Sequence, residues 1–177
     1  MKILFIGNSH TYVNDLPELF AQLCRAHGIA VHVTMLTRPG IGLEDHAAEP
    51  QTRFNILFGG YDYVVLQHRA HPMGDLQQMH DGAAKILDWV KQAGSTPIFY
   101  QTWAAQGEEA YQSTMSGVYQ RLGEEFSVRV APVGDAWLKA RQEDPALSLY
   151  GPDGQHASPA GSRLAAKTIF DTIFPET

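Results

Sequence analysis

The chain has 177 residues, of which 44% are hydrophobic and 18% charged, as is usual for one compact globular domain. Its 13 basic and 19 acidic residues give a formal net charge of −6. This charge argues against a protein that wraps nucleic acid and against a basic helix on a membrane surface. The sequence predicts a single domain over residues 1–177, with no nucleic-acid or membrane partner.

The single cysteine and the N-terminal residues bear on location. Cys24 cannot form an internal disulfide or a multi-thiolate metal site, and its apolar helical surroundings predict a small buried side chain. No apolar run approaches the roughly 20 residues that a membrane crossing needs. The apolar stretch 3–6 runs directly into Gly7 and is too short for a signal peptide. We therefore expect a first buried strand and a cytoplasmic protein.

Short apolar runs alternate with helical patterns along the chain. The runs have strand length and are rich in β-branched or aromatic residues: 3–6, 31–36, 63–66, 97–100 and 128–133. Apolar residues at helical spacing occupy the segments 16–27, 76–90, 111–122 and 159–170. The segment 37–58 is less regular, and we expect a functional loop there with one or two short helices. The alternation predicts an α/β fold in which a parallel five-stranded sheet is covered by helices on both faces.

Polar residues follow the predicted strands, at the sheet edge where ligands of such folds bind. Ser9 and His10 follow the first strand, and Gly40 and Gly42 follow the second. The other candidates come from the later connections: Gln67, His68, His71, Gln101, Trp103, Asp153 and His156. This edge therefore collects a serine, histidines, a carboxylate, amides and glycines.

Three of these residues fit nucleophilic catalysis. A serine hydrolase needs a nucleophile, an imidazole base, a carboxylate that orients the base, and donors for the oxyanion. Asp153 lies three residues before His156, so in a tight loop its carboxylate can reach Nδ1 and leave Nε2 free for Ser9. Taken singly, Ser9 also fits a helix cap, Asp153 a turn and His156 a surface loop. Their joint placement at one edge favours the catalytic interpretation.

Several other catalytic and nucleotide-binding motifs do not occur. Thr11 stands where the second glycine of a G-x-S-x-G elbow would be, which argues against an α/β-hydrolase. The sequence contains no P-loop and no H-E-x-x-H motif, and the segment 40–42 lacks the third glycine of a dinucleotide fingerprint.

Four segments together resemble the SGNH (GDSL-type) hydrolases, and more narrowly their divergent bacterial branch. Residues 6–11 are similar to the first block, G-[DN]-S, and residues 40–43 to the glycine-containing second block. Residues 62–67 resemble the third strand, and residues 153–161 resemble the last block, D-x-x-H followed by [ST]-P-x-G. The segments span nearly the whole chain in the family's order, and the last one is the most specific.

The resemblance implies a flavodoxin-like, three-layer α/β/α fold and an esterase that needs no cofactor. It implies a triad of Ser9, His156 and Asp153, and three oxyanion donors: the Ser9 N–H, a glycine N–H and an asparagine side chain. We favour Gly40 as the glycine, with Gly42 as the alternative. Both glycines can also serve only to permit a positive φ in the loop.

The third block departs from the family pattern G-x-N-D, because residues 67–71 contain no asparagine. Gln67 can present an amide N–H to the oxyanion from slightly earlier on the strand, and His71 falls close to the usual asparagine position. We favour Gln67, since a neutral amide donates at any pH. In the alternative interpretation, Gln67 only hydrogen-bonds loop backbone.

The leading hypothesis is a serine esterase that cleaves a small ester, such as an acetyl group on a carbohydrate. His10 and Trp103 are candidate pocket residues, although Trp103 fits loop packing equally well. A second hypothesis is a metal-dependent hydrolase, with Asp45 or Asp153 beside loop histidines: His10, His46, His68, His71 and His156. A third is a binding protein without catalytic activity on the same scaffold.

Overall fold

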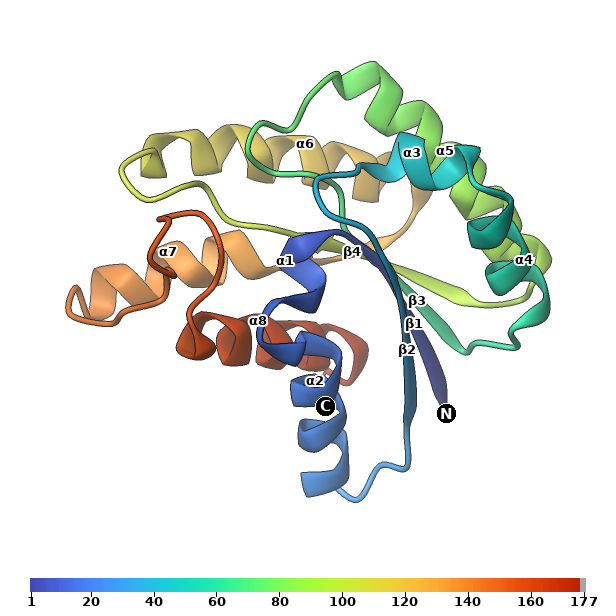
Figure 1. Ribbon diagram of the computed structural model, residues 1–177, viewed down its shortest axis with the longest axis horizontal. Coiled ribbons are helices and arrows are strands. Elements are labelled where there is room, and N and C mark those ends of the chain that lie inside the picture. The colour runs from blue at the N-terminus through green and yellow to red at the C-terminus, as the bar shows by residue number, and fades with distance from the viewer. Residues whose placement is uncertain (176–177) are drawn as a thin grey trace.

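Five parallel strands form one sheet in the order β2-β1-β3-β4-β5 (Figure 1). The computed structural model describes residues 1–175. The strands are β1 (Lys2–Gly7), β2 (His32–Thr37), β3 (Tyr63–Leu66), β4 (Thr96–Gln101) and β5 (Arg129–Pro132). This order is that of the flavodoxin-like folds, and it confirms the predicted parallel sheet.

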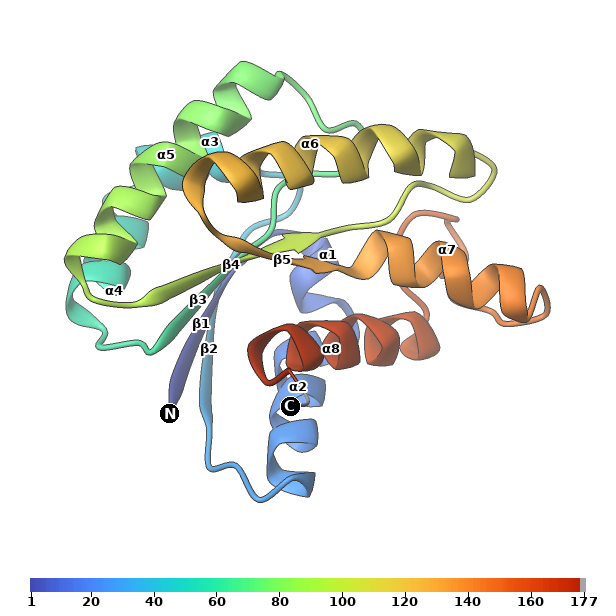
Figure 2. The same cartoon turned by 180° about the vertical axis from the view of Figure 1, so that it is seen from behind.

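Helices cover both faces of the sheet and complete the three layers (Figures 1 and 2). One face carries α2 (Leu16–Ala26), α7 (Val133–Glu143) and α8 (Pro159–Ile173). The other carries α3 (Leu43–Ala48), α4 (Pro50–Phe58), α5 (Leu76–Gln92) and α6 (Gln112–Phe126). The short elements are α1 (Ser9–Tyr12), η1 (Val13–Asp15) and η2 (Glu109–Tyr111). Two short helices, α3 and α4, lie in the segment 37–58, as expected.

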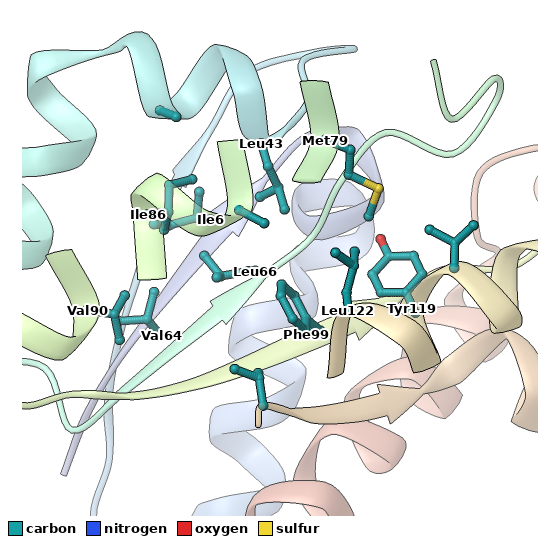
Figure 3. Packing of buried hydrophobic residues seen from close by; sticks show 14 of the residues in the cluster. Ile6, Leu43, Val64, Leu66, Met79, Ile86, Val90, Phe99, Tyr119 and Leu122 are labelled. Atoms are coloured by element: carbon teal, nitrogen blue, oxygen red, sulfur yellow. The ribbon is translucent and has the colours of Figure 1, made fainter. Parts of the chain in front are cut away.

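The alternation of side chains along each strand divides the core in two. In β1, Ile3 and Phe5 pack under α2 and α8, whereas Leu4 and Ile6 face α3 and α5, because successive strand residues point to opposite faces. Figure 3 shows the second of these clusters, with β3, β4, α5 and α6 contributing around Ile6. Cys24 is fully buried in the first cluster, as predicted.

The helix α7 is not predicted by the apolar pattern of the sequence. Its buried side chains are sparse, since Val133 and Trp137 are the only large apolar residues of the helix that reach the core. An apolar stripe this short gives no clear helical periodicity in the sequence. Within residues 1–175, no helix combines the length and the apolar character that crossing a membrane requires.

Candidate active site

Ser9 lies at the carboxyl end of the inner strand β1, as the first residue of α1. A glycine is needed two residues before it, because a Cβ on Gly7 would clash with both Gln67 Oε1 and Thr11 Oγ1. The Asn8 side chain caps α1, with its Oδ1 accepting from the His10 N–H at 3.1 Å. The chain therefore turns sharply from strand to helix and presents Ser9 at the sheet edge.

The structure brings Ser9, His156 and Asp153 together in one hydrogen-bonded line. His156 Nε2 lies 2.8 Å from Ser9 Oγ, and His156 Nδ1 lies 2.5 Å from Asp153 Oδ2. Asp153 Oδ1 accepts the backbone N–H groups of Gln155 and His156, at 3.0 and 2.9 Å. The His156 hydrogen bond, followed by these two, holds the pKa of Asp153 well below its usual range. An ionised carboxylate thus orients an imidazole whose other nitrogen faces a serine hydroxyl.

Three hydrogen bonds hold the loop that carries His156 in place. Within the loop, the Gly151 N–H donates to the His156 carbonyl at 2.7 Å. Trp103 Nε1–H donates to the Gln155 carbonyl at 2.8 Å. Asn14 Nδ2–H donates to the Ala157 carbonyl at 2.9 Å and so ties the segment after Ser9 to this loop. No local sequence signal marks Asn14 for this role, because its partner is 143 residues away in the chain.

The structure gives Gln67 a different role from the predicted oxyanion donor. Its side chain is fully buried, and its Oε1 accepts from the Asn8 N–H and the Thr11 hydroxyl, each at 2.8 Å. Its Nε2–H donates to the His68 carbonyl. The Asn8 N–H can only donate, so Oε1 must face it and the orientation of the amide is fixed. Gln67 therefore braces the residues on either side of Ser9, and these bonds favour the alternative interpretation, in which its amide hydrogen-bonds loop backbone.

His71 is also badly placed as a substitute donor. Its Nε2–H donates to the Trp103 carbonyl at 2.9 Å, and its buried Nδ1 has no partner within residues 1–175. Burial, more than any other influence, lowers the pKa of His71. A neutral ring whose only N–H is already engaged has none left for an oxyanion.

The loop 40–43 connects β2 to α3 and contacts residues that follow β1 and β3. Three polar side chains hold it in place. Asn8 Nδ2–H donates to the Ile41 carbonyl at 3.0 Å, while the Gly42 N–H donates to Asp45 Oδ2 at 2.7 Å. The Leu43 N–H donates to His68 Nδ1 at 3.1 Å. Gly42 is thereby engaged, whereas the Gly40 N–H has no protein partner among the described residues. Gly40 has φ +68° and open space around it, so it fits a donor position better than Gly42.

The two candidate pocket residues, Trp103 and His10, are both buried, at 1% and 8% exposure. Trp103 stacks on Trp137 with ring centroids 4.0 Å apart, and its edge meets the His10 ring at 5.2 Å. These contacts and the bond to Gln155 favour loop packing for Trp103. His10 stacks on His156, with centroids 5.1 Å apart, and so borders the reacting groups.

The described residues contain no group of three or more His, Cys, Asp or Glu positioned to hold a metal ion. Two more of the histidines named for such a site bind backbone, as His71 does. His46 Nε2–H donates to the Gly7 carbonyl at 2.9 Å, and His68 Nε2–H donates to the Met73 carbonyl at 2.6 Å. Their nitrogens hold the ends of β1 and of the loop after β3.

Comparison with known proteins agrees with this geometry at the level of the fold. No model of a protein family matches the sequence, and no curated protein matches it significantly. Among solved structures, a candidate SGNH hydrolase from Slackia heliotrinireducens is similar, with TM-score 0.83, 26% identity and 98% of both chains covered. A variant of Axe2, an acetyl xylan esterase from Geobacillus stearothermophilus, has TM-score 0.81 and 17% identity over 99% of this chain and 95% of that one.

A member of the lipolytic G-D-S-L family from Veillonella parvula has TM-score 0.73 and 16% identity over 99% of this chain and 100% of that one. The three similarities cover 98%, 99% and 99% of this chain. The chain therefore has the fold of the SGNH hydrolases.

Proposed function

We propose that this protein is a serine esterase that removes a short acyl group, such as acetyl, from a hydrophilic alcohol. The observation that carries the proposal is the line Ser9–His156–Asp153, with its contacts of 2.8 and 2.5 Å. Such a line is the arrangement by which a neutral imidazole activates a serine hydroxyl. The similarity in fold to SGNH hydrolases and to an acetyl xylan esterase supports the same reaction class.

In the first half of the reaction, Ser9 Oγ attacks the ester carbonyl while His156 Nε2 takes the hydroxyl proton. Asp153 keeps the remaining ring proton on Nδ1 and stabilises the imidazolium that forms. The Ser9 and Gly40 N–H groups are the backbone donors for the oxyanion. His156 then returns its proton to the departing alcohol, and the acyl group stays on Ser9. Water, activated by His156, releases the acid in the second half.

The openness of the site supports a small acyl group. The Asp153 side chain is 50% exposed and the His156 side chain 34% exposed, so the reacting groups lie close to solvent. A long acyl chain would need an apolar tunnel to leave water. The rings beside Ser9 are instead imidazoles, which suit a hydrophilic substrate.

The test is covalent labelling together with turnover. A fluorophosphonate should add once to the wild type and not to Ser9→Ala, as read by intact mass. Ser113→Ala is a matched control, because Ser113 lies on α6 and its hydroxyl only donates to the Ala110 carbonyl. Turnover of p-nitrophenyl esters should fall from acetate to octanoate. Labelling that survives in Ser9→Ala would refute the proposal, and a wild type that neither labels nor turns over any ester would favour the binding protein.

A further inference from the structure

His10 carries an imidazole for which residues 1–175 provide no hydrogen bond. The backbone of His10 is fully engaged: its N–H donates to Asn8 Oδ1, and its carbonyl accepts from the Tyr100 hydroxyl at 3.1 Å. The ring is different, since Nδ1 is buried without a partner and Nε2 has none among the described residues. Only Nδ1 is enclosed, so the remaining 8% exposure of the residue leaves Nε2 an opening.

Three rings fix the plane of His10. His156 stacks on it at 5.1 Å with 22° between the planes, and His71 and Trp103 meet it edge-on at 5.1 and 5.2 Å. His10 directly follows Ser9 in the chain, and its ring stacks on the His156 ring that contacts Ser9 Oγ, so the ring lies beside the reacting groups. The position is therefore rigid and next to the reacting atoms.

The ring is neutral in the working range of an esterase. Burial, and after it the neighbouring His71 and His156, lowers the pKa of His10 to about 3. A neutral imidazole has one N–H donor and one lone-pair acceptor. A phenyl ring would make the same stacking contacts without enclosing unpaired polar atoms, so packing alone does not explain a histidine here.

We propose that His10 Nε2 binds a hydroxyl group of the substrate, next to the ester that Ser9 attacks. A hydroxyl both donates and accepts, so it pairs with either tautomer of the ring. A carboxylate or an ammonium on the substrate would bind best to a side chain of opposite charge, and a neutral imidazole carries no charge. The inference rests on the proposed esterase function and narrows its substrates to partly acylated polyols that keep a free hydroxyl near the ester.

The experiment compares two acetates of equal size. Ethylene glycol monoacetate ends in a hydroxyl where propyl acetate ends in a methyl group. Wild type should favour the former by about tenfold in kcat/KM, the value of one good hydrogen bond. In His10→Phe the stack is kept and both nitrogens are lost, so this preference should fall to near one. The ratio isolates recognition, because any disturbance of His156 slows both esters alike.

The matched control is His27→Phe, since the His27 ring packs on Phe170 at 4.7 Å, at the end of α2. This variant should keep the wild-type preference. An unchanged ratio in His10→Phe, or a wild type without preference for the hydroxyl ester, would overturn the proposal.

Binding can be read without turnover in Ser9→Ala. Ethylene glycol monoacetate should shift the ¹⁵N resonance of His10 Nε2, and propyl acetate should not. Equal responses to the two esters would also overturn the assignment. If the wild type hydrolyses neither ester but this shift occurs, the esterase function fails while the hydroxyl site stands.

Discussion

Replacing Gln67 with methionine should lower both stability and turnover. The substitution keeps the volume of the side chain but removes its amide, whose Oε1 accepts from the Asn8 N–H and the Thr11 hydroxyl. The His68 carbonyl loses its donor as well. An unsatisfied buried group costs about 1–3 kcal/mol, and the Thr11 hydroxyl can rotate toward another acceptor. With the Asn8 N–H and the His68 carbonyl left unsatisfied, we expect a loss of about 2–6 kcal/mol in the free energy of unfolding.

Turnover should fall with stability because Ser9 lies between the two residues that Gln67 holds. A displacement of about 1 Å in a reacting group can cost about 100-fold in rate. Urea unfolding followed by circular dichroism gives the stability, and p-nitrophenyl acetate hydrolysis, measured where the variant is still folded, gives kcat. A Gln67→Met protein of wild-type stability whose kcat has fallen about 100- to 1,000-fold would refute this reasoning and restore Gln67 as an oxyanion donor.

Two further variants sharpen this test. Thr11→Val removes one of the two partners of Oε1, and a double-mutant cycle with Gln67→Met isolates their coupling, which we expect to be about 1 kcal/mol. Gln67→Glu keeps an acceptor for Asn8 and Thr11 but turns a second oxygen toward the His68 carbonyl. Its stability should recover as the pH falls and the buried carboxyl takes a proton that it can donate.

Two other features lead to predictions. The free energy of unfolding should fall between pH 7 and pH 5 by about 2 kcal/mol for each of His10 and His68. Burial lowers their pKa values to about 3 and about 4, so the unfolded chain takes up protons that the folded one does not. Denaturant unfolding at several pH values measures this, and a free energy of unfolding that is the same at pH 7 and pH 5 would contradict it. Trp103→Phe keeps the stack on Trp137 but loses the hydrogen bond to the Gln155 carbonyl, so kcat should fall while the sheet's circular dichroism is unchanged. A wild-type kcat in Trp103→Phe would show that the loop positions His156 without this hydrogen bond.

The local patterns of the sequence were sufficient for the strands and for most of the helices. The strand segments 3–6 and 63–66 are short, β-branched or aromatic and bounded by polar residues, and each lies within an observed strand. The spacing of Asp153 and His156 also holds locally, because both lie in one turn. The sparse apolar stripe of α7 gave no such pattern.

What the sequence could not settle is which way a side chain turns at the sheet edge. Gln67 directly follows a buried strand, and from the sequence its amide can point toward the substrate or inward. The outcome depends on the Asn8 N–H, which lies between β1 and α1, and on the Thr11 hydroxyl of α1. Asn14 presents the same difficulty, since the carbonyl that it binds is distant in the chain.

The distance along the chain between Ser9 and His156 has a consequence for synthesis. These residues are 147 positions apart, and Asn14 joins their two segments only when the loop before α8 has docked. A ribosome-bound chain can therefore pair β1 with β2 and β3 long before it can activate a nucleophile. Recovery of esterase activity during refolding should lag behind formation of the sheet, so activity would measure how much of the chain has completed folding.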